Sequence, residues 1–131
     1  MSTPPKHAVG TVGWMDLTVK DAVAVKDFYQ DVVGWKGSGL DMGGYEDFVM
    51  TPPGSEDGAA GICHARGSNA DQPSGWMVYI TVADLERSLE RVAAKGGKVR
   101  GKIRDAGPSG RYCVVEDPSG SVCALFESAK G

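Results

Sequence analysis

The stretch TVGWMDLTVKDAVAVKDFYQDVVGW, residues 11–35, decides the fold. Its first part suits a β-strand, an Asp follows, and an amphipathic helix then continues to Gly34. The same plan returns at residues 75–98 as GWMVYITVADLERSLERVAAKGGK, and a shift of 63 residues aligns Thr18 with Thr81 and Gly34 with Gly97. The chain is therefore predicted to contain two copies of one β-α unit.

Each copy is followed by shorter extended segments that Gly-rich and Pro-rich turns separate. The first half is predicted to have a strand at 8–19, a helix capped by Asp21, and strands at 35–40, 45–51 and 59–65. The second half is predicted to have a strand from 75, a helix capped by Asp84, and strands at 98–104, 111–116 and 122–127. The apolar helix positions expected in the core are Val25, Tyr29, Val32, Leu85, Leu89 and Val92.

Each half thus reads as β-α-β-β-β, which predicts an α+β fold made of two tandem modules. One helix covers one face of a four-stranded sheet, so two such sheets can curl into a shared incomplete barrel around a central cavity, with the helices outside. We expect a single domain over 1–131, with module one at 8–66, a polar linker at 67–74 and module two at 75–128. Each half alone would bury too little surface to be stable.

Composition excludes several classes of function. The 131 residues carry a net charge of -3 without a dense basic run, which argues against nucleic-acid and membrane-surface partners. No apolar run is long enough to span a bilayer, and the first ten residues lack an apolar signal core, so a cytoplasmic protein is expected. The three cysteines, Cys63, Cys113 and Cys123, lack CxxC spacing and are expected to be reduced, mostly buried thiols.

The repeat and three short motifs resemble the vicinal oxygen chelate superfamily, which includes glyoxalase I, extradiol dioxygenases and bleomycin-binding proteins. The motifs are Phe28-Tyr29, Val33-Gly34-Trp35 and Glu116-Asp117-Pro118-Ser119-Gly120. Within the superfamily the chain resembles a subgroup that lacks the metal ligands, whose marks here are residues 14–17 (WMDL) and 110–112 (GRY). The resemblance covers about residues 9–127. It implies the shared barrel, and it implies a homodimer as the expected assembly.

The resemblance also implies where a divalent metal would be held, by one side chain from the first strand and one from the last strand of each half. These positions fall on Trp14, Met77, Ala124 and either Gly61 or Cys63. Indole and alanine offer no lone pair, and the sulfur of Met or Cys is too soft for a hard cation. The sequence therefore predicts no metal and no cofactor. His7 and His64 are expected to be solvated imidazoles, with His64 pointing away from the face of Cys63.

Strand alternation places Trp14, Asp16, Met77, Tyr79, Thr81 and Phe126 on the predicted cavity face. Such a lining suits a small, partly apolar organic ligand. Asp16 is either an anchor or general base for that ligand or a buried carboxylate satisfied by Arg111, Tyr79 or backbone amides. Tyr45 is expected to close the pocket from a Gly-rich lid at 37–44. Arg111 is expected to hold an anionic ligand or to form a salt bridge with an acid.

Three functions compete. The first is a ligand-binding protein without a divalent metal, whose predicted contacts are Trp14, Asp16, Tyr45, Met77, Tyr79, Phe126 and Arg111. The second is a metal-dependent lyase, isomerase or dioxygenase with relocated ligands drawn from His64, Asp16, Glu46 or Asp47. The third is a redox protein that works through the thiol of Cys63 or Cys113.

Overall fold

The structure is a computed structural model that describes residues 8–67 and 70–129. The predicted lead-in at 1–6 and His7 lie outside the described residues. The order of the elements is β1 (Val12–Val19), α1 (Ala22–Val33), β2 (Lys36–Asp41), β3 (Glu46–Thr51), β4 (Ala60–His64), β5 (Trp76–Thr81), α2 (Leu85–Ala94), β6 (Lys98–Asp105), the 3₁₀ turn η2 (Gly107–Ser109), β7 (Gly110–Glu116) and β8 (Val122–Ser128). The α+β class and the tandem βαβββ modules are confirmed.

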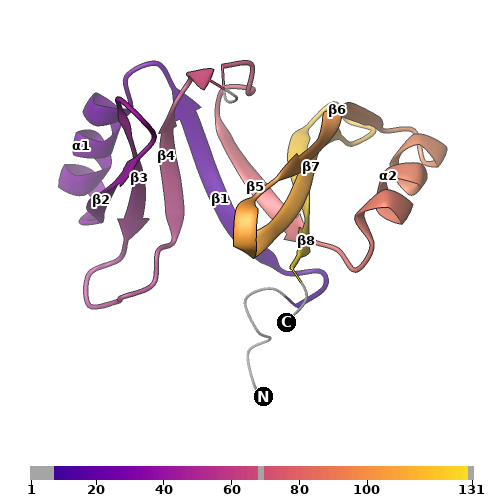
Figure 1. Cartoon of the computed structure of the whole chain (residues 1–131), viewed down its shortest axis with the longest axis horizontal. Coiled ribbons are helices and arrows are strands. Elements are labelled where there is room, and N and C mark those ends of the chain that lie inside the picture. The colour runs from indigo at the N-terminus through magenta and orange to yellow at the C-terminus, as the bar shows by residue number, and fades with distance from the viewer. Residues whose placement is uncertain (1–7, 68–69, 130–131) are drawn as a thin grey trace. The chain divides into compact units, whose positions relative to one another are not determined.

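The chain divides into two compact units, each with one helix and a run of adjacent strands (Figure 1). The N-terminal unit, residues 15–76, carries the strand order β2-β3-β4-β1, in which only β1 and β4 pair in parallel. The C-terminal unit comprises residues 8–14 and 77–129 and carries the order β5-β8-β7-β6, in which only β5 and β8 pair in parallel. The two units therefore repeat one topology, as the sequence repeat predicts.

Helix α1 begins and ends where the sequence predicts. The Asp21 carboxylate accepts a hydrogen bond from the Ala24 N–H at 3.0 Å, and Gly34 ends the helix in the left-handed conformation with φ 87°. Ala22 at the start of the helix forms a buried core cluster with Phe48, Met50 and Ile62. The partly buried side chains that pack against this cluster are Val25, Tyr29, Trp35 and Trp76, among others. The expectation for Val32 is wrong. Its side chain is 61% exposed, whereas the α1 residues that pack on the core are Ala22, Val25 and Tyr29.

Helix α2 is anchored at its first turn. Asp84 caps it by accepting from the Arg87 N–H at 3.1 Å, and Leu85 is fully buried. The Leu85 N–H is one of the donors that a helix start leaves unpaired, and it donates to Glu127 Oε1 on β8 at 2.8 Å. This bond joins the start of α2 to the sheet of the same unit.

Two predicted boundaries need correction. The first strand begins at Val12 rather than residue 8, since residues 8–10 form a turn in which the Thr11 N–H donates to the Ala8 carbonyl. The lid predicted at 37–44 is mostly strand, because β2 pairs with β3 from Lys36↔Thr51 to Asp41↔Glu46.

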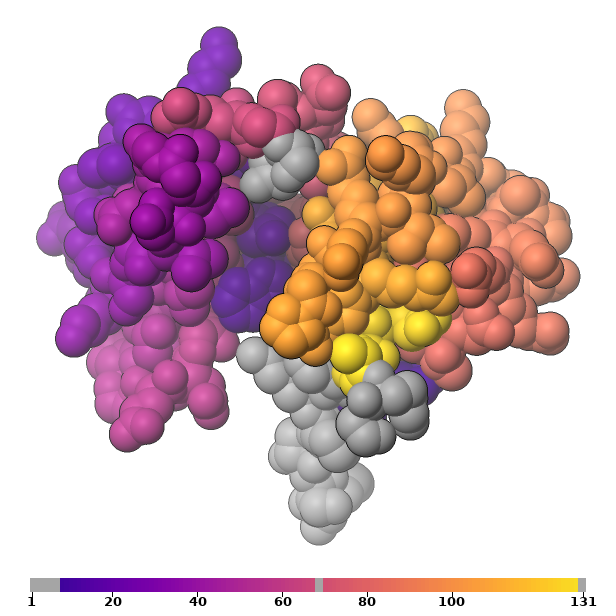
Figure 2. Space-filling model, viewed as in Figure 1, coloured from indigo at the N-terminus to yellow at the C-terminus, as the bar shows by residue number. Residues whose placement is uncertain are grey.

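Most residues of β6, an edge strand, are exposed, and β6 and β7 form part of the surface seen in orange in Figure 2.

In the described part of the chain, no helix combines the length and apolarity that crossing a bilayer requires.

Candidate functional site

One face of the C-terminal sheet carries most of the predicted cavity residues. The register pairs Tyr79 with Ala124 and Thr81 with Phe126, and paired residues share a face. Helix α2 lies against the opposite face, because its Leu85 N–H reaches Glu127, whose side chain alternates with that of Phe126. Met77, Tyr79, Thr81 and Phe126 therefore lie together, on the side away from the helix.

Tyr112 belongs to the same face, although the sequence analysis used it only as part of a motif. Tyr112 pairs with Phe126 across β7 and β8, and its ring centroid lies 5.4 Å from that of Tyr79, with the two planes at 61°. This edge-to-face geometry is favourable between aromatic rings. Alternation along one strand does not give this placement, because Tyr112 meets Phe126 through the β7-β8 register. The five residues Met77, Tyr79, Thr81, Tyr112 and Phe126 are called the aromatic face below.

The positions that would hold a metal are filled by other kinds of side chain. Met77 and Ala124 are buried and form one core cluster with Val114. Gly61 and Cys63 lie on β4, paired with Asp16 and Thr18 of β1. Among residues 8–67 and 70–129, no three His, Cys, Asp or Glu side chains lie together in a way that could hold a metal ion.

In the N-terminal unit, Asp16 shares a sheet face with Cys63, because Thr18 pairs with Cys63 and Asp16 lies two residues earlier. Asp47 on β3 is only 4% exposed, and its Oδ1 accepts from the His64 N–H at 2.8 Å. Burial is the main cause that raises the pKa of Cys63 to about 12, and the charges of Asp16 and Asp47 add to it. The thiol is therefore protonated at neutral pH.

The other two cysteines give no better nucleophile. Burial raises the pKa of Cys113 and of Cys123 as well. A thiolate is the reactive form of cysteine, so all three environments disfavour thiol chemistry. All three cysteines are free thiols in the structure, but the expectation that they are mostly buried is wrong, because only Cys113 is buried while Cys63 and Cys123 are partly exposed.

The expectation that His64 is a solvated imidazole is wrong. Its side chain is 14% exposed, its Nδ1 lies 2.9 Å from the Glu46 carbonyl oxygen and 3.6 Å from Asp47 Oδ1, and its ring meets that of Tyr45 edge to face. His64 does point away from the face of Cys63, since it pairs with Val19 on the side that packs under α1. The imidazole is thus held by the β3-β4 hairpin.

Tyr45 is held in place rather than free to swing. The Arg66 guanidinium lies over its ring, 4.2 Å from the centroid, and the His64 ring lies 5.6 Å away on another side. The Met42 N–H donates to the Tyr45 carbonyl and closes the short turn between β2 and β3. A lid at this place would consist of that turn alone.

Arg111 lies on the other face of the C-terminal sheet, beside α2, so the structure does not bring it together with Tyr79 and Phe126. Its guanidinium forms ion pairs with Glu86 at 2.8 Å and Glu127 at 3.2 Å, which is the salt-bridge alternative given above. These hydrogen bonds raise the pKa of Arg111 above its ordinary value, and the Leu85 N–H and Arg111 lower the pKa of Glu127.

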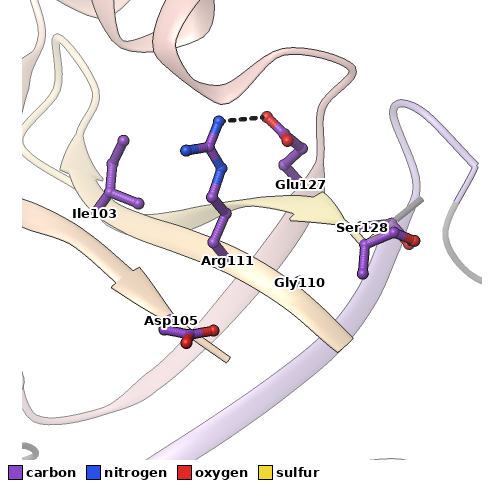
Figure 3. A pocket seen from close by; sticks show the side chains of 7 residues that line it. Ile103, Asp105, Gly110, Arg111, Glu127 and Ser128 are labelled. Carbon is purple, nitrogen blue, oxygen red and sulfur yellow. Dashed lines mark hydrogen bonds and ion pairs between the residues drawn. The ribbon is translucent and has the colours of Figure 1, made fainter. Parts of the chain in front are cut away.

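A pocket of about 380 Å³, which the sequence does not predict, adjoins this ion pair (Figure 3). It is lined by Ile103, Asp105, Gly110, Arg111, Glu127, Ser128 and Ala129. Figure 3 shows Arg111 directed toward Glu127, with Asp105 on the neighbouring strand β6. No spacing in the sequence brings these residues together, because they meet only through the β6-β7-β8 register.

Comparison with known proteins places this geometry in a family. The model of the Glyoxalase/Bleomycin resistance protein/Dioxygenase superfamily matches residues 11–125. A protein named "Putative glyoxylase CFP32" from Mycobacterium tuberculosis is 32% identical over 127 residues, which cover 94% of this chain and 48% of that protein. "Anthracycline biosynthesis protein DauV" from Streptomyces sp. strain C5 is 31% identical over 138 residues, 92% of this chain and 48% of that protein.

Among solved structures, the fold is shared by methylmalonyl-CoA epimerase from Mycobacterium tuberculosis, with a TM-score of 0.59, 20% identity and 95% of each chain covered. The chain spans about half the length of the curated relatives that it matches. The match to the family model, which covers most of the sequence, shows that this chain belongs to the Glyoxalase/Bleomycin resistance protein/Dioxygenase superfamily.

Proposed function

We propose that this chain binds a small, partly apolar organic ligand against the aromatic face and does so without a divalent metal. One observation carries the proposal, namely the Tyr79–Tyr112 ring pair on the sheet face opposite α2, with Met77 and Phe126 beside it. Aromatic and thioether side chains offer a large polarizable surface to an organic ring. A few polar groups among such side chains are typical of small-molecule sites.

Trp14, Asp16 and Tyr45 are proposed as further contacts on the sequence pattern alone. Trp14 and Asp16 lie on alternate positions of β1 and share its face, and Tyr45 is held at the end of the β2-β3 turn. Asp16 would hold an amine or hydroxyl of the ligand. Arg111 is not included, because it lies on the α2 face of the sheet, where its guanidinium pairs with Glu86 and Glu127.

The absence of a metal is proposed from the chemistry of the side chains. A hard divalent cation needs oxygen or imidazole ligands. Trp14, Met77 and Ala124 offer neither, and the fourth position falls on Gly61 or Cys63. A thiol whose pKa is raised to about 12 is also a poor ligand, because a metal binds the thiolate.

The test uses 2-methylnaphthalene, an uncharged two-ring probe, in equilibrium dialysis. Loss of one ring contact costs about 0.5–1.5 kcal/mol, so Tyr79→Leu and Tyr112→Leu should each weaken binding roughly three- to tenfold. The matched control is Phe28→Leu, which changes an aromatic residue that is 55% exposed on α1. The proposal fails if the wild-type chain shows no saturable binding, or if Phe28→Leu weakens binding as much as the tyrosine variants do.

A homodimer and a cytoplasmic location belong with this proposal. The homodimer is supported by exposed apolar side chains, since Phe28 and Val32 lie one turn apart on α1 and are 55% and 61% exposed. Light scattering should give about twice the 13.7 kDa chain mass. A mass of one chain at micromolar concentration would contradict the dimer and leave the ligand proposal standing.

A further inference from the structure

The hydroxyl of Thr81 is the one buried side-chain oxygen or nitrogen without a hydrogen-bond partner among the described residues. Thr81 is only 3% exposed. Its backbone is fully paired, since the Thr81 N–H donates to the Thr11 carbonyl at 2.9 Å and the Thr81 carbonyl accepts from the Gly10 N–H at 2.8 Å. The orphaned group is therefore the side-chain hydroxyl alone.

The neighbouring strand provides no hydrogen-bond partner for this hydroxyl. On the aromatic face, the cross-strand neighbour of Thr81 is Phe126, whose ring neither donates nor accepts a conventional hydrogen bond. The neighbouring Val82 N–H and Phe126 carbonyl are already paired with each other, at 2.8 Å. Thr81 thus places a lone donor and acceptor at the end of an otherwise apolar and aromatic strip.

A buried polar group without a partner destabilises a protein, and such groups are rare in native structures. Valine has the same shape as threonine and would fill this place without the penalty. A threonine here is explained if the hydrogen-bond partner of its hydroxyl is a group of the ligand. A site built to hydrogen-bond a substrate group rejects the analogue that lacks that group.

We propose that Thr81 is the polar anchor of the aromatic face and that it selects ligands whose aromatic or apolar body carries a hydroxyl or carbonyl oxygen. This inference rests on the proposed function and narrows its ligand class. The ligand oxygen pairs with the Thr81 hydroxyl while the ligand body lies against Tyr79 and Tyr112. Nothing in this arrangement requires a covalent step.

The test compares two probes of the same shape, 2-naphthol and 2-methylnaphthalene, by equilibrium dialysis with wild-type protein and Thr81→Val. Since a neutral hydrogen bond contributes about 0.5–1.5 kcal/mol, the preference for 2-naphthol over 2-methylnaphthalene should fall roughly three- to tenfold in the variant. The ligand-free variant should also melt roughly 3–6 °C higher, because it no longer buries an unpaired hydroxyl.

Thr11→Val is the matched control in the same unit, because the Thr11 hydroxyl donates to the Ala8 carbonyl at 2.6 Å. This variant should lower the melting temperature and leave the preference between the probes unchanged. A lower melting temperature for Thr81→Val would mean that water or protein already satisfies the hydroxyl, and it would overturn the inference. An unchanged preference in Thr81→Val would overturn it as well, with the proposed function intact. If neither probe binds wild-type protein, the proposed function itself fails.

Discussion

Gly110 occupies a place in the β7-β8 sheet where any side chain would collide with backbone, so Gly110→Ala tests the packing around the pocket in Figure 3. The residue has φ 140° and ψ −145°, a region that only glycine adopts readily. An added Cβ would overlap the Glu127 carbonyl oxygen and would lie 2.9 Å from the Ala129 nitrogen. These are backbone atoms held by the β7-β8 ladder, in which Gly110 pairs with Ser128.

The expected loss of stability has two parts. Backbone strain costs about 1–3 kcal/mol, and the forced displacement of packed atoms adds about 1–3 kcal/mol. Gly120→Ala is the control for the first part, because Gly120 has φ 90° in the turn of the same hairpin and nothing lies within 4 Å of its added Cβ. That variant should lose only about 1–2 kcal/mol.

The assay is urea unfolding followed by far-ultraviolet circular dichroism. With a slope of about 1–3 kcal/mol per molar urea, Gly110→Ala should unfold at a midpoint roughly 1 M below that of Gly120→Ala. Equal midpoints for the two variants would refute the reasoning, because the close approach of Gly110 to the Glu127 carbonyl would then carry no cost.

Two further predictions concern ionisable groups. The pKa of Cys63 is raised to about 12, so iodoacetamide at pH 8 should leave Cys63 unmodified in native protein and modify it in urea. Peptide mass mapping measures the modification, and rapid labelling of Cys63 in the native chain would contradict the prediction. The folded pKa of Glu127 is lowered from 4.5 by the Leu85 N–H and Arg111, so its stabilisation is complete above about pH 4.5 and is lost as pH falls through the folded pKa. The stability difference between wild type and Glu127→Gln should therefore shrink in acid unfolding series below pH 4.5. A constant difference would argue against the ion pair.

The fold could be predicted from the sequence because its determinants are local. Asp21 and Asp84 cap the helices that they precede, and Gly34 ends α1, so the elements follow from caps, stops and periodicity. The internal repeat then gives the topology, because one module implies the other. Periodicity does not predict the exposure of Val32, because its spacing from Val25 matches the core stripe while its side chain is 61% exposed.

The candidate site was predicted less completely because it depends on register between strands. Alternation alone placed Tyr79 and Phe126 on one face, but Tyr112 joins them only through the β7-β8 pairing. The sequence does not show that His64 is buried, because its contacts with Glu46 and Asp47 come from another strand. The orphaned hydroxyl of Thr81 could not be read from the sequence at all, since a missing partner is a property of the packed structure.

The central claim is that this member of the superfamily binds its ligand with Trp14, Met77 and Ala124 where a metal would otherwise be held. The most direct measurement is elemental analysis of the purified chain, joined to the dissociation constant of 2-naphthol with and without EDTA. We expect far less than one divalent ion per chain and a dissociation constant that EDTA leaves unchanged. One bound ion per chain, whose removal by EDTA abolishes probe binding, would contradict it.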